Sequence, residues 1–305
     1  MNRHELLDIA TIRLSSLFLG GTKFFAHSID SPPLVEVTTE TTPPIDDLGD
    51  PSTAGRHDVV VDTPLGEFEA AYLPWRWLGA EYPTLIYHHG SGEQPFDVGR
   101  FSANSFRRLF LATEEDLPVN LITIQAPFHD GSNREYIRMM GDLENFVGML
   151  AASAGLLEAI TERLADRTDG SVAVSGISLG GWVINLHRAC FGSAHRYVPL
   201  FAGAALGEMF ASSAYRYMTA DAARSRPSRL RELLNFETEF RGVDADDCAP
   251  LLGRYDRIIE YDRQRSSYTG MSIAVLDRGH VTGSLAGGSL REHVLAGVLD
   301  TDARA

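Results

Sequence analysis

The chain has almost no lysine and no excess of positive charge. Lys23 is the only lysine among 27 basic residues, so the other 26 are arginines, and 41 acidic residues outnumber them. Proteins that bind nucleic acid need clustered basic side chains against the phosphates. The formal net charge of −14 therefore leads us to expect no nucleic-acid partner.

Cysteine is also scarce. Cys190 and Cys248 are the only two in the chain. A secreted disulfide scaffold would carry many more, and these two lack the spacing of metal ligands. We expect both to be reduced side chains that pack in the interior.

A long apolar run is missing from the first 30 residues. The most apolar stretch there, residues 14–20, is interrupted by Ser15 and Ser16. It is too short to cross a membrane and poorly shaped for a signal peptide. We therefore expect a cytoplasmic protein with no integral membrane span. A helix over residues 9–25 would still present an apolar face, either to a membrane surface or to the core, and the sequence leaves both open.

Proline suggests a division of the chain near residue 55. Five prolines lie between residues 31 and 55, where they suppress both helix and ladder hydrogen bonding. We predict an N-terminal helical segment followed by a Pro-rich, extended linker over residues 1–55. Residues 56–305 form one domain in this interpretation, since a chain with 44% hydrophobic residues can bury a large core.

Short apolar runs alternate with helix-length segments in the predicted domain. Runs at 57–62 and 67–73 flank a Pro-Gly turn and predict an antiparallel hairpin. Compact runs at 84–87, 120–124 and 171–174 are each followed by a helix-length segment, which predicts a parallel sheet with helical crossovers. Further strands are expected at 197–201, 250–252 and 272–276. Residues 204–248 have many helix formers and few strand signals, and predict a helical cap inserted over the sheet.

Gly176-Ile177-Ser178-Leu179-Gly180 has the pattern G-x-S-x-G, and Gly181 follows it. The motif comes after the apolar run 171–174 and opens the helical run 182–190, which is the strand, turn, helix arrangement of a nucleophile elbow. Its glycines leave room where the turn presses against neighbouring backbone, while the serine hydroxyl is held out over the sheet. Ser178 is the predicted nucleophile, and a Gly-Ser turn without chemistry is the alternative.

A serine hydroxyl needs a base near neutral pH, and the base needs a group that orients it. Four histidines follow Ser178. His187 falls within the predicted elbow helix, His195 precedes the next strand, and His293 lies in a predicted terminal helix. His280 follows the last predicted strand, at the carboxyl edge of the sheet where ligands bind in open α/β folds. It is the predicted base.

Asp256 is the predicted orienting acid. It follows the short apolar run 250–252 and a turn, which aims it at the same sheet edge. Glu208, after the preceding strand, is the main rival. A surface salt bridge is the alternative role for either carboxylate.

Acyl transfer also needs donors for a developing oxyanion, and backbone N–H groups suit this role because they are fixed before reaction. The N–H of Leu179, directly after the serine, is one candidate. The segment Tyr87-His88-His89-Gly90-Ser91-Gly92 follows the strand 84–87. Adjacent histidines on an extended strand point to opposite faces, so we expect no metal shared by His88 and His89.

Together, His89-Gly90-Ser91-Gly92, the Ser178 elbow, residues 253–256 and Gly279-His280 resemble the four landmarks of the α/β-hydrolase superfamily. The resemblance spans the chain from about residue 57 onward. It implies a mostly parallel, eight-stranded sheet flanked by helices, a two-step reaction through an acyl-enzyme, and no cofactor. It also gives the N–H of Ser91 as the second oxyanion donor and places His89 and Gly90 beside the substrate. His129, in the turn Pro127-Phe128-His129-Asp130 after the fourth strand, is expected to border the site as well, and turn formation alone is the alternative role of this segment.

These residues predict a serine hydrolase that cleaves a carboxylic ester of a small molecule, without a metal. A peptidase, an amidase or an acyltransferase would use the same triad. A non-catalytic binding protein on this scaffold is a further alternative, but it would be free to lose Ser178, Asp256 or His280, and all are present. The sequence makes no prediction of oligomeric state.

Overall fold

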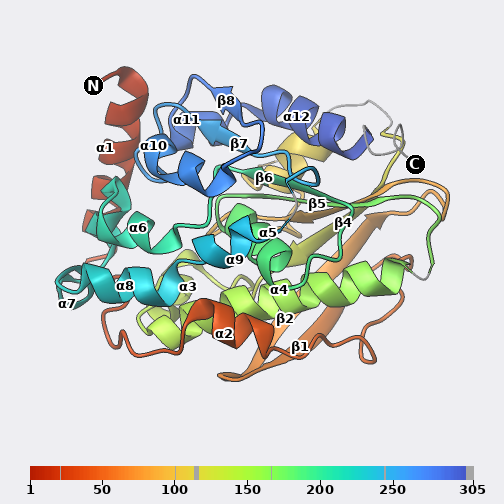
Figure 1. Ribbon diagram of the computed structural model, residues 1–305, viewed down its shortest axis with the longest axis horizontal. Helices are drawn as coiled ribbons and strands as arrows, with labels where there is room; N and C mark the ends of the chain where they lie inside the picture. The colour runs from red at the N-terminus through yellow and green to blue at the C-terminus, as the bar shows by residue number, and fades with distance from the viewer. Residues whose placement is uncertain (21, 100, 113–116, 166, 244, 300–305) are drawn as a thin grey trace.

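The computed structural model describes residues 1–20, 22–99, 101–112, 117–165, 167–243 and 245–299. The last residues of the predicted domain, 300–305, lie outside this set. Eight strands form one sheet in the order β1-β2-β4-β3-β5-β6-β7-β8 (Figure 1). The strands are β1 (His57–Thr63), β2 (Gly66–Arg76), β3 (Thr84–His88), β4 (Asn120–Gln125), β5 (Val172–Ile177), β6 (Arg196–Leu200), β7 (Leu251–Gly253) and β8 (Ala274–Leu276).

The sheet is parallel except at its first two strands. β1 and β2 form the predicted antiparallel hairpin, and β2 is also antiparallel to β4. The other pairs, from β4 across to β8, are parallel. β3, β4 and β5 are buried at every position, as expected for parallel strands covered on both faces. The prediction of a mostly parallel, eight-stranded sheet is confirmed.

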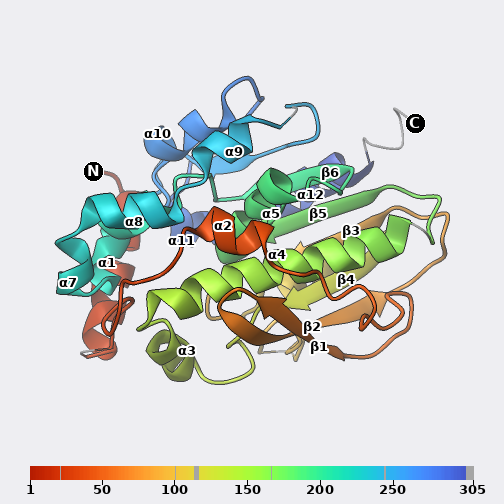
Figure 2. The same cartoon turned by 60° about the horizontal axis from the view of Figure 1, so that its bottom comes forward.

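Helices cover both faces of the sheet. α4 (Leu143–Ala165) and α5 (Leu179–Cys190) pack on one face, with α2 (Leu34–Thr39) beside them (Figure 2). η1 (Arg107–Leu111), a π-helical turn, and α12 (Gly287–Leu299) pack on the other. Ile86 belongs to the first apolar cluster, whereas Leu85 and Tyr87 belong to the second, because successive side chains of a strand point to opposite faces.

The described residues between β6 and β7 form the predicted helical insertion. Its helices are α6 (Leu206–Ala211), η2 (Ala214–Met218), α7 (Asp221–Arg224), α8 (Pro227–Leu234) and α9 (Glu237–Arg241). The remaining short helices are α3 (Asn133–Met139), α10 (Tyr261–Gln264), η3 (Arg265–Tyr268) and α11 (His280–Ser284).

α4 is apolar around its whole circumference. It is long and apolar enough to cross a membrane, but 89% of its most apolar window is buried within the fold. Two glycines allow this burial. A Cβ at Gly148 would overlap the ring of Phe68 on β2, and one at Gly155 would lie 2.8 Å from Cγ2 of Thr41. A helix that is apolar all round is typical of a core position, and α4 occupies one.

The N-terminal segment packs against the cap and the core. α1 (Arg3–Phe18) contacts η2 and α11, and buries Asp8 and Ile12. Its opposite face leaves Leu14 and Phe18 exposed, at 54% and 88%. Residues 24 and 25 then pass between the cap and the core, where their N–H groups donate to the carbonyls of Met218 (2.9 Å) and Met140 (2.8 Å).

The predicted extended linker over residues 31–55 contains a short helix, α2, so this prediction is wrong in part. Pro33 occupies the N-cap position, where its missing N–H removes no intrahelical hydrogen bond. Leu34 and Val37 are fully buried beside α4. Their burial anchors the segment to the domain. A helix of only six residues is too short for its apolar periodicity to be recognised in the sequence.

Candidate active site

Ser178 lies in a sharp turn between β5 and α5. Its backbone adopts φ 53° and ψ −108°, a positive-φ conformation that a non-glycine residue rarely adopts. Hydrogen bonds hold the turn: the Ser178 N–H donates to the carbonyl of Leu200 (2.9 Å), and the Trp182 N–H donates to the carbonyl of Ser178 (3.0 Å). Such strain costs on the order of 1–3 kcal/mol, which the surrounding packing offsets.

Three glycines make this turn possible. A Cβ at Gly176 would lie 2.5 Å from the carbonyl carbon of Gly180, and one at Gly181 would lie 2.7 Å from Cβ of Ala202. A Cβ at Gly180 would overlap the carbonyl of His88 on β3. The elbow is therefore wedged between two neighbouring strands with no room for side chains beside the serine.

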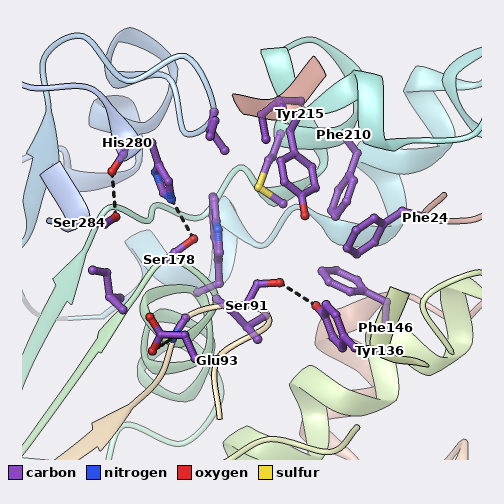
Figure 3. A pocket seen from close by; sticks show the side chains of 17 residues that line it. Phe24, Ser91, Glu93, Tyr136, Phe146, Ser178, Phe210, Tyr215, His280 and Ser284 are labelled. Carbon is purple, nitrogen blue, oxygen red and sulfur yellow. Dashed lines mark hydrogen bonds between the residues drawn. The ribbon is translucent and has the colours of Figure 1, made fainter. Parts of the chain in front are cut away.

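The structure brings Ser178, His280 and Asp256 together at the carboxyl edge of the sheet. Nε2 of His280 lies 3.1 Å from Oγ of Ser178 (Figure 3), and Nδ1 of His280 lies 2.7 Å from Oδ2 of Asp256. The other oxygen of Asp256 accepts the N–H groups of Ile258 (2.8 Å) and Ile259 (2.7 Å). The carboxylate is thus fixed by the backbone and faces the imidazole with one oxygen.

Two opposing effects set the pKa of His280. Burial disfavours the imidazolium and would lower this pKa, but the nearby Asp256 carboxylate and its hydrogen bond favour the charged form. Asp8 adds a second negative charge. The carboxylates prevail, and the pKa of His280 is raised above its ordinary value.

Glu208, the rival acid, faces arginines of the cap and of α10 instead of His280. It accepts a hydrogen bond from Nε of Arg231 (2.9 Å) and lies 3.5 Å from Nε of Arg263. Burial would raise the pKa of Glu208, but these hydrogen bonds and charges hold it below the ordinary value. The alternative role considered for both carboxylates, a partly exposed ion pair, fits Glu208 and does not fit Asp256.

The other three histidines after Ser178 are engaged elsewhere. His187 contacts Glu158 (2.8 Å), His195 accepts the N–H of Val172 (3.1 Å), and His293 lies 2.9 Å from the carbonyl of Ala249. Each ring fills a place in the fold away from Ser178.

The loop after β3 places the N–H of Ser91 beside the cavity. The N–H groups of Gly90 and Gly92 donate to Oε2 of Glu93 (3.3 Å) and to Nε2 of His129 (3.2 Å). Within the described ranges, no partner accepts from the N–H of Ser91. The N–H of Leu179 also has no acceptor among the described residues, because Leu179 opens α5 and the first N–H groups of a helix have no intrahelical partner. Both residues line the same cavity as Ser178.

Neither His89 nor His129 is among the described residues that line the cavity beside Ser178, which differs from the prediction that both contact substrate. The ring of His89 lies 2.7 Å from the carbonyl of Gly90 and accepts the N–H of Ala126 (3.0 Å). His129 accepts the N–H of Gly92 and lies 2.9 Å from the carbonyl of Pro127. Burial lowers the pKa of His129 to about 4 and that of His89 well below its ordinary value. The two neutral rings hold the loop after β3 through hydrogen bonds. Gly90, in contrast, lines the cavity.

His88 and His89 also differ from expectation. Their rings stack with centroids 4.8 Å apart, because β3 ends at His88 and the alternation of side chains ends with it. Across the described residues, no group of three or more histidine, cysteine or acidic side chains is placed to hold a metal ion.

Glu93 is a site residue that the sequence did not reveal. Its Oε2 accepts the N–H of Gly90 and both the N–H (3.0 Å) and the hydroxyl (2.6 Å) of Ser105. The carboxylate therefore ties the loop after β3 to the segment before η1. No local pattern joins Glu93 to a serine 12 residues later.

A cavity of about 250 Å³ opens beside Ser178. Aromatic rings from four parts of the chain converge on it, as Figure 3 shows for Phe24, Tyr136, Phe146, Phe210 and Tyr215. At one side the hydroxyl of Ser91 donates to the Tyr136 hydroxyl (3.0 Å). The other lining residues are Ile12, Gly90, Glu93, Ile177, Leu179, Trp182, Met209, Ile258, His280 and Ser284.

Comparison with known proteins shows which fold this chain shares with solved structures. No family description and no curated protein sequence matches this chain. Among solved structures, an acylaminoacyl peptidase of Pyrococcus horikoshii is 15% identical with a TM-score of 0.51; the match covers 79% of this chain but only 40% of the peptidase. A peroxisomal α/β-hydrolase of Saccharomyces cerevisiae is 10% identical with a TM-score of 0.50, over 82% of this chain and 90% of that protein. Identities this low show a shared fold only. The chain has the α/β-hydrolase fold, as the sequence predicts.

Proposed function

We propose that this protein is a serine hydrolase that cleaves carboxylic esters of short to medium acyl groups through an acyl-enzyme on Ser178. The observation that carries the proposal is the hydrogen-bonded series from Ser178 through His280 to Asp256, at the edge of an apolar cavity. A strained serine beside a largely buried base and a buried acid is the arrangement that nucleophilic acyl transfer needs.

In the first step, Oγ of Ser178 attacks the ester carbonyl carbon while Nε2 of His280 takes the hydroxyl proton. The N–H groups of Leu179 and Ser91 donate to the oxyanion that forms on the carbonyl oxygen. The intermediate then breaks its bond to the alkoxide, which leaves as the alcohol after receiving the proton from His280. Asp256 stays ionised, keeps Nε2 facing the serine and stabilises the imidazolium.

In the second step, water takes the place of the alcohol. Nε2 of His280 removes a proton from the water as its oxygen attacks the acyl carbon, and the same two N–H groups hold the oxyanion. The bond to Oγ breaks, the proton returns to Ser178, and the carboxylic acid leaves. An acyltransferase would differ only in accepting another hydroxyl or amine at this point.

The lining of the cavity supports an uncharged, apolar acyl group. Glu93 is the one carboxylate among the lining residues, and its Oε2 is already hydrogen-bonded to Ser105 and Gly90. A volume near 250 Å³ is at or below the lower end of ligand pockets. This space suits a compact acyl chain better than an extended peptide, so we favour ester hydrolysis over peptidase activity.

Substitution of the nucleophile tests the proposal most simply. We expect the protein to hydrolyse p-nitrophenyl acetate and butyrate, and Ser178→Ala to lower kcat by a thousandfold or more, on the order expected for a triad serine. A fluorophosphonate probe should label wild type and Ser212→Ala, which changes an exposed serine of the cap, but not Ser178→Ala. Labelling of a different serine, or equal turnover by Ser178→Ala, would exclude this nucleophile.

A pair of carboxylate variants tests the acid. Asp256→Asn keeps the shape but removes the charge that supports the imidazolium, so kcat should fall by roughly a thousandfold to ten-thousandfold. Glu208→Gln weakens an ion pair of the cap and should change kcat only slightly. Both are measured on p-nitrophenyl acetate with thermal melts alongside. A large loss of kcat in Glu208→Gln, with a kcat near that of wild type in Asp256→Asn, would show that the acid is wrongly assigned.

A pair of methionines in the cap tests its role in acyl selection. Met209 lines the cavity and Met218 does not, although both are buried. Met209→Ala enlarges the pocket and should raise the ratio of kcat/KM for the hexanoate over the acetate ester several-fold. Met218→Ala should leave that ratio unchanged. Equal ratios in wild type and both variants would show that the cap does not select the acyl chain.

A further inference from the structure

Helix α1 carries a carboxylate into the interior beside the two loops that bear His280 and Asp256. Asp8 is fully buried. Its Oδ2 accepts the N–H of His280 (2.8 Å) and the N–H of Arg257 (3.1 Å), and its Oδ1 accepts the N–H of Val281 (3.0 Å). These partners lie 249 to 273 positions away in sequence. One side chain of the N-terminal segment therefore joins the loop after β7 to the beginning of α11.

The carboxylate supplies what the local sequence of α11 lacks. The first N–H groups of a helix need acceptors from outside it, and a side chain at the N-cap commonly provides one. Here the N-cap is Gly279, which has no side chain. Asp8 accepts the N–H groups of His280 and Val281 in its place. A Cβ at Gly279 would lie 2.7 Å from Oδ2 of Asp8, so the glycine leaves the space that the carboxylate fills.

We propose that Asp8 is a positioning residue of the catalytic site, which fixes the backbone of His280 relative to the Asp256 loop so that the imidazole meets both Asp256 and Ser178. The inference rests on the proposed function. It makes α1 a part of the catalytic unit, although none of the family landmarks lies in this segment. The contrasting role is purely structural, in which Asp8 stabilises the fold without affecting the properties of His280.

The charge of Asp8 gives the two roles different consequences. The charged and titratable groups near Asp8 are Asp256, Arg257 and His280. Glu260 forms an ion pair with Arg257, and His4 of α1 contacts Thr282 of α11. Burial and the like charge of Asp256 raise the pKa of Asp8, while three N–H donors favour its ionised form. The ionised carboxylate helps to raise the pKa of His280. Removing the charge should therefore lower the pKa of His280.

The substitution Asp8→Asn tests this directly. An amide offers one acceptor oxygen where the carboxylate offers two, so at least one of the three backbone N–H groups faces an NH2 group and the anchor is weakened. We expect the plateau of kcat on p-nitrophenyl acetate to fall by about tenfold to a hundredfold, as for a small misplacement of a reacting group. The acid limb of kcat/KM, which reports deprotonation of His280, should move to lower pH.

Ser16→Ala is the matched control on the same helix. It removes the hydrogen bond from the Ser16 hydroxyl to the carbonyl of Tyr217 (2.9 Å), which also docks α1 but touches neither triad loop. This variant should keep the plateau and the acid limb of wild type. A pH profile for Asp8→Asn that coincides with wild type would overturn the proposal, whatever the change in melting temperature.

A titration of His280 by NMR separates this inference from the proposed function, because it needs no substrate. We expect the imidazole resonances of His280 to titrate at lower pH in Asp8→Asn than in wild type or Ser16→Ala. If the protein cleaves no ester, the proposed function fails while this titration still tests Asp8. An unchanged pKa of His280 in an ester-cleaving enzyme would overturn the role of Asp8 alone.

Gly279→Ala perturbs the same contact from the other side and leaves every charge in place. The added methyl group should displace the Asp8 carboxylate and lower kcat. In the Asp8→Ala background the methyl group has room, so the further cost of Gly279→Ala should largely vanish. Two fully additive losses would show that Gly279 acts on His280 without Asp8, and would contradict the proposal.

Discussion

The backbone of Ser178 is the constraint on which the rest of the site depends. A serine held at φ 53° needs glycines on both sides and a strand and a helix packed firmly enough to offset the strain. β5 is buried along its length, and α5 packs against it and against β3 and β6. The turn is thus defined by the centre of the sheet, and the hydroxyl position follows from the core packing.

The groups that meet this hydroxyl come from separate strand ends. The loops after β3, β7 and β8 reach the same edge because their strands run parallel to β5. Each loop is then fixed by its own anchor. Glu93 and the neutral rings of His89 and His129 hold the loop after β3, and two N–H groups hold Asp256. Asp8 joins the last two loops to α1.

The parts of this account that could be predicted from sequence are those with a local signal. Alternating apolar runs predict the strands, and the glycines around Ser178 mark the elbow. The order of serine, acid and histidine, combined with strand ends, selects Asp256 and His280 from several candidates. Their short distances in the structure agree with that choice.

The residues that escaped prediction act across long separations in the chain. Nothing near Asp8 indicates that its partners lie some 270 positions later, and Glu93 reaches a serine in another segment. The roles predicted for His89, in the loop after β3, and for His129, after β4, differ from the structure for a related reason. Their residue type suggested contact with substrate, but burial and backbone hydrogen bonds commit both ring nitrogens of His89 and His129 to holding the loop. Polar anchors of this kind follow from tertiary packing and leave no periodic pattern.

The central claim is that an acyl group passes through Ser178. Rapid acid quench of the wild-type protein during turnover of p-nitrophenyl acetate, followed by intact-mass and peptide mass spectrometry, tests it directly. We expect a protein heavier by one acetyl group, with the acetyl on the peptide that contains Ser178. A burst of p-nitrophenol near one equivalent should accompany it if deacylation is the slower step. An acetyl group found on a different residue during steady hydrolysis, or hydrolysis that continues undiminished in Ser178→Ala with no adduct at any time, would contradict it.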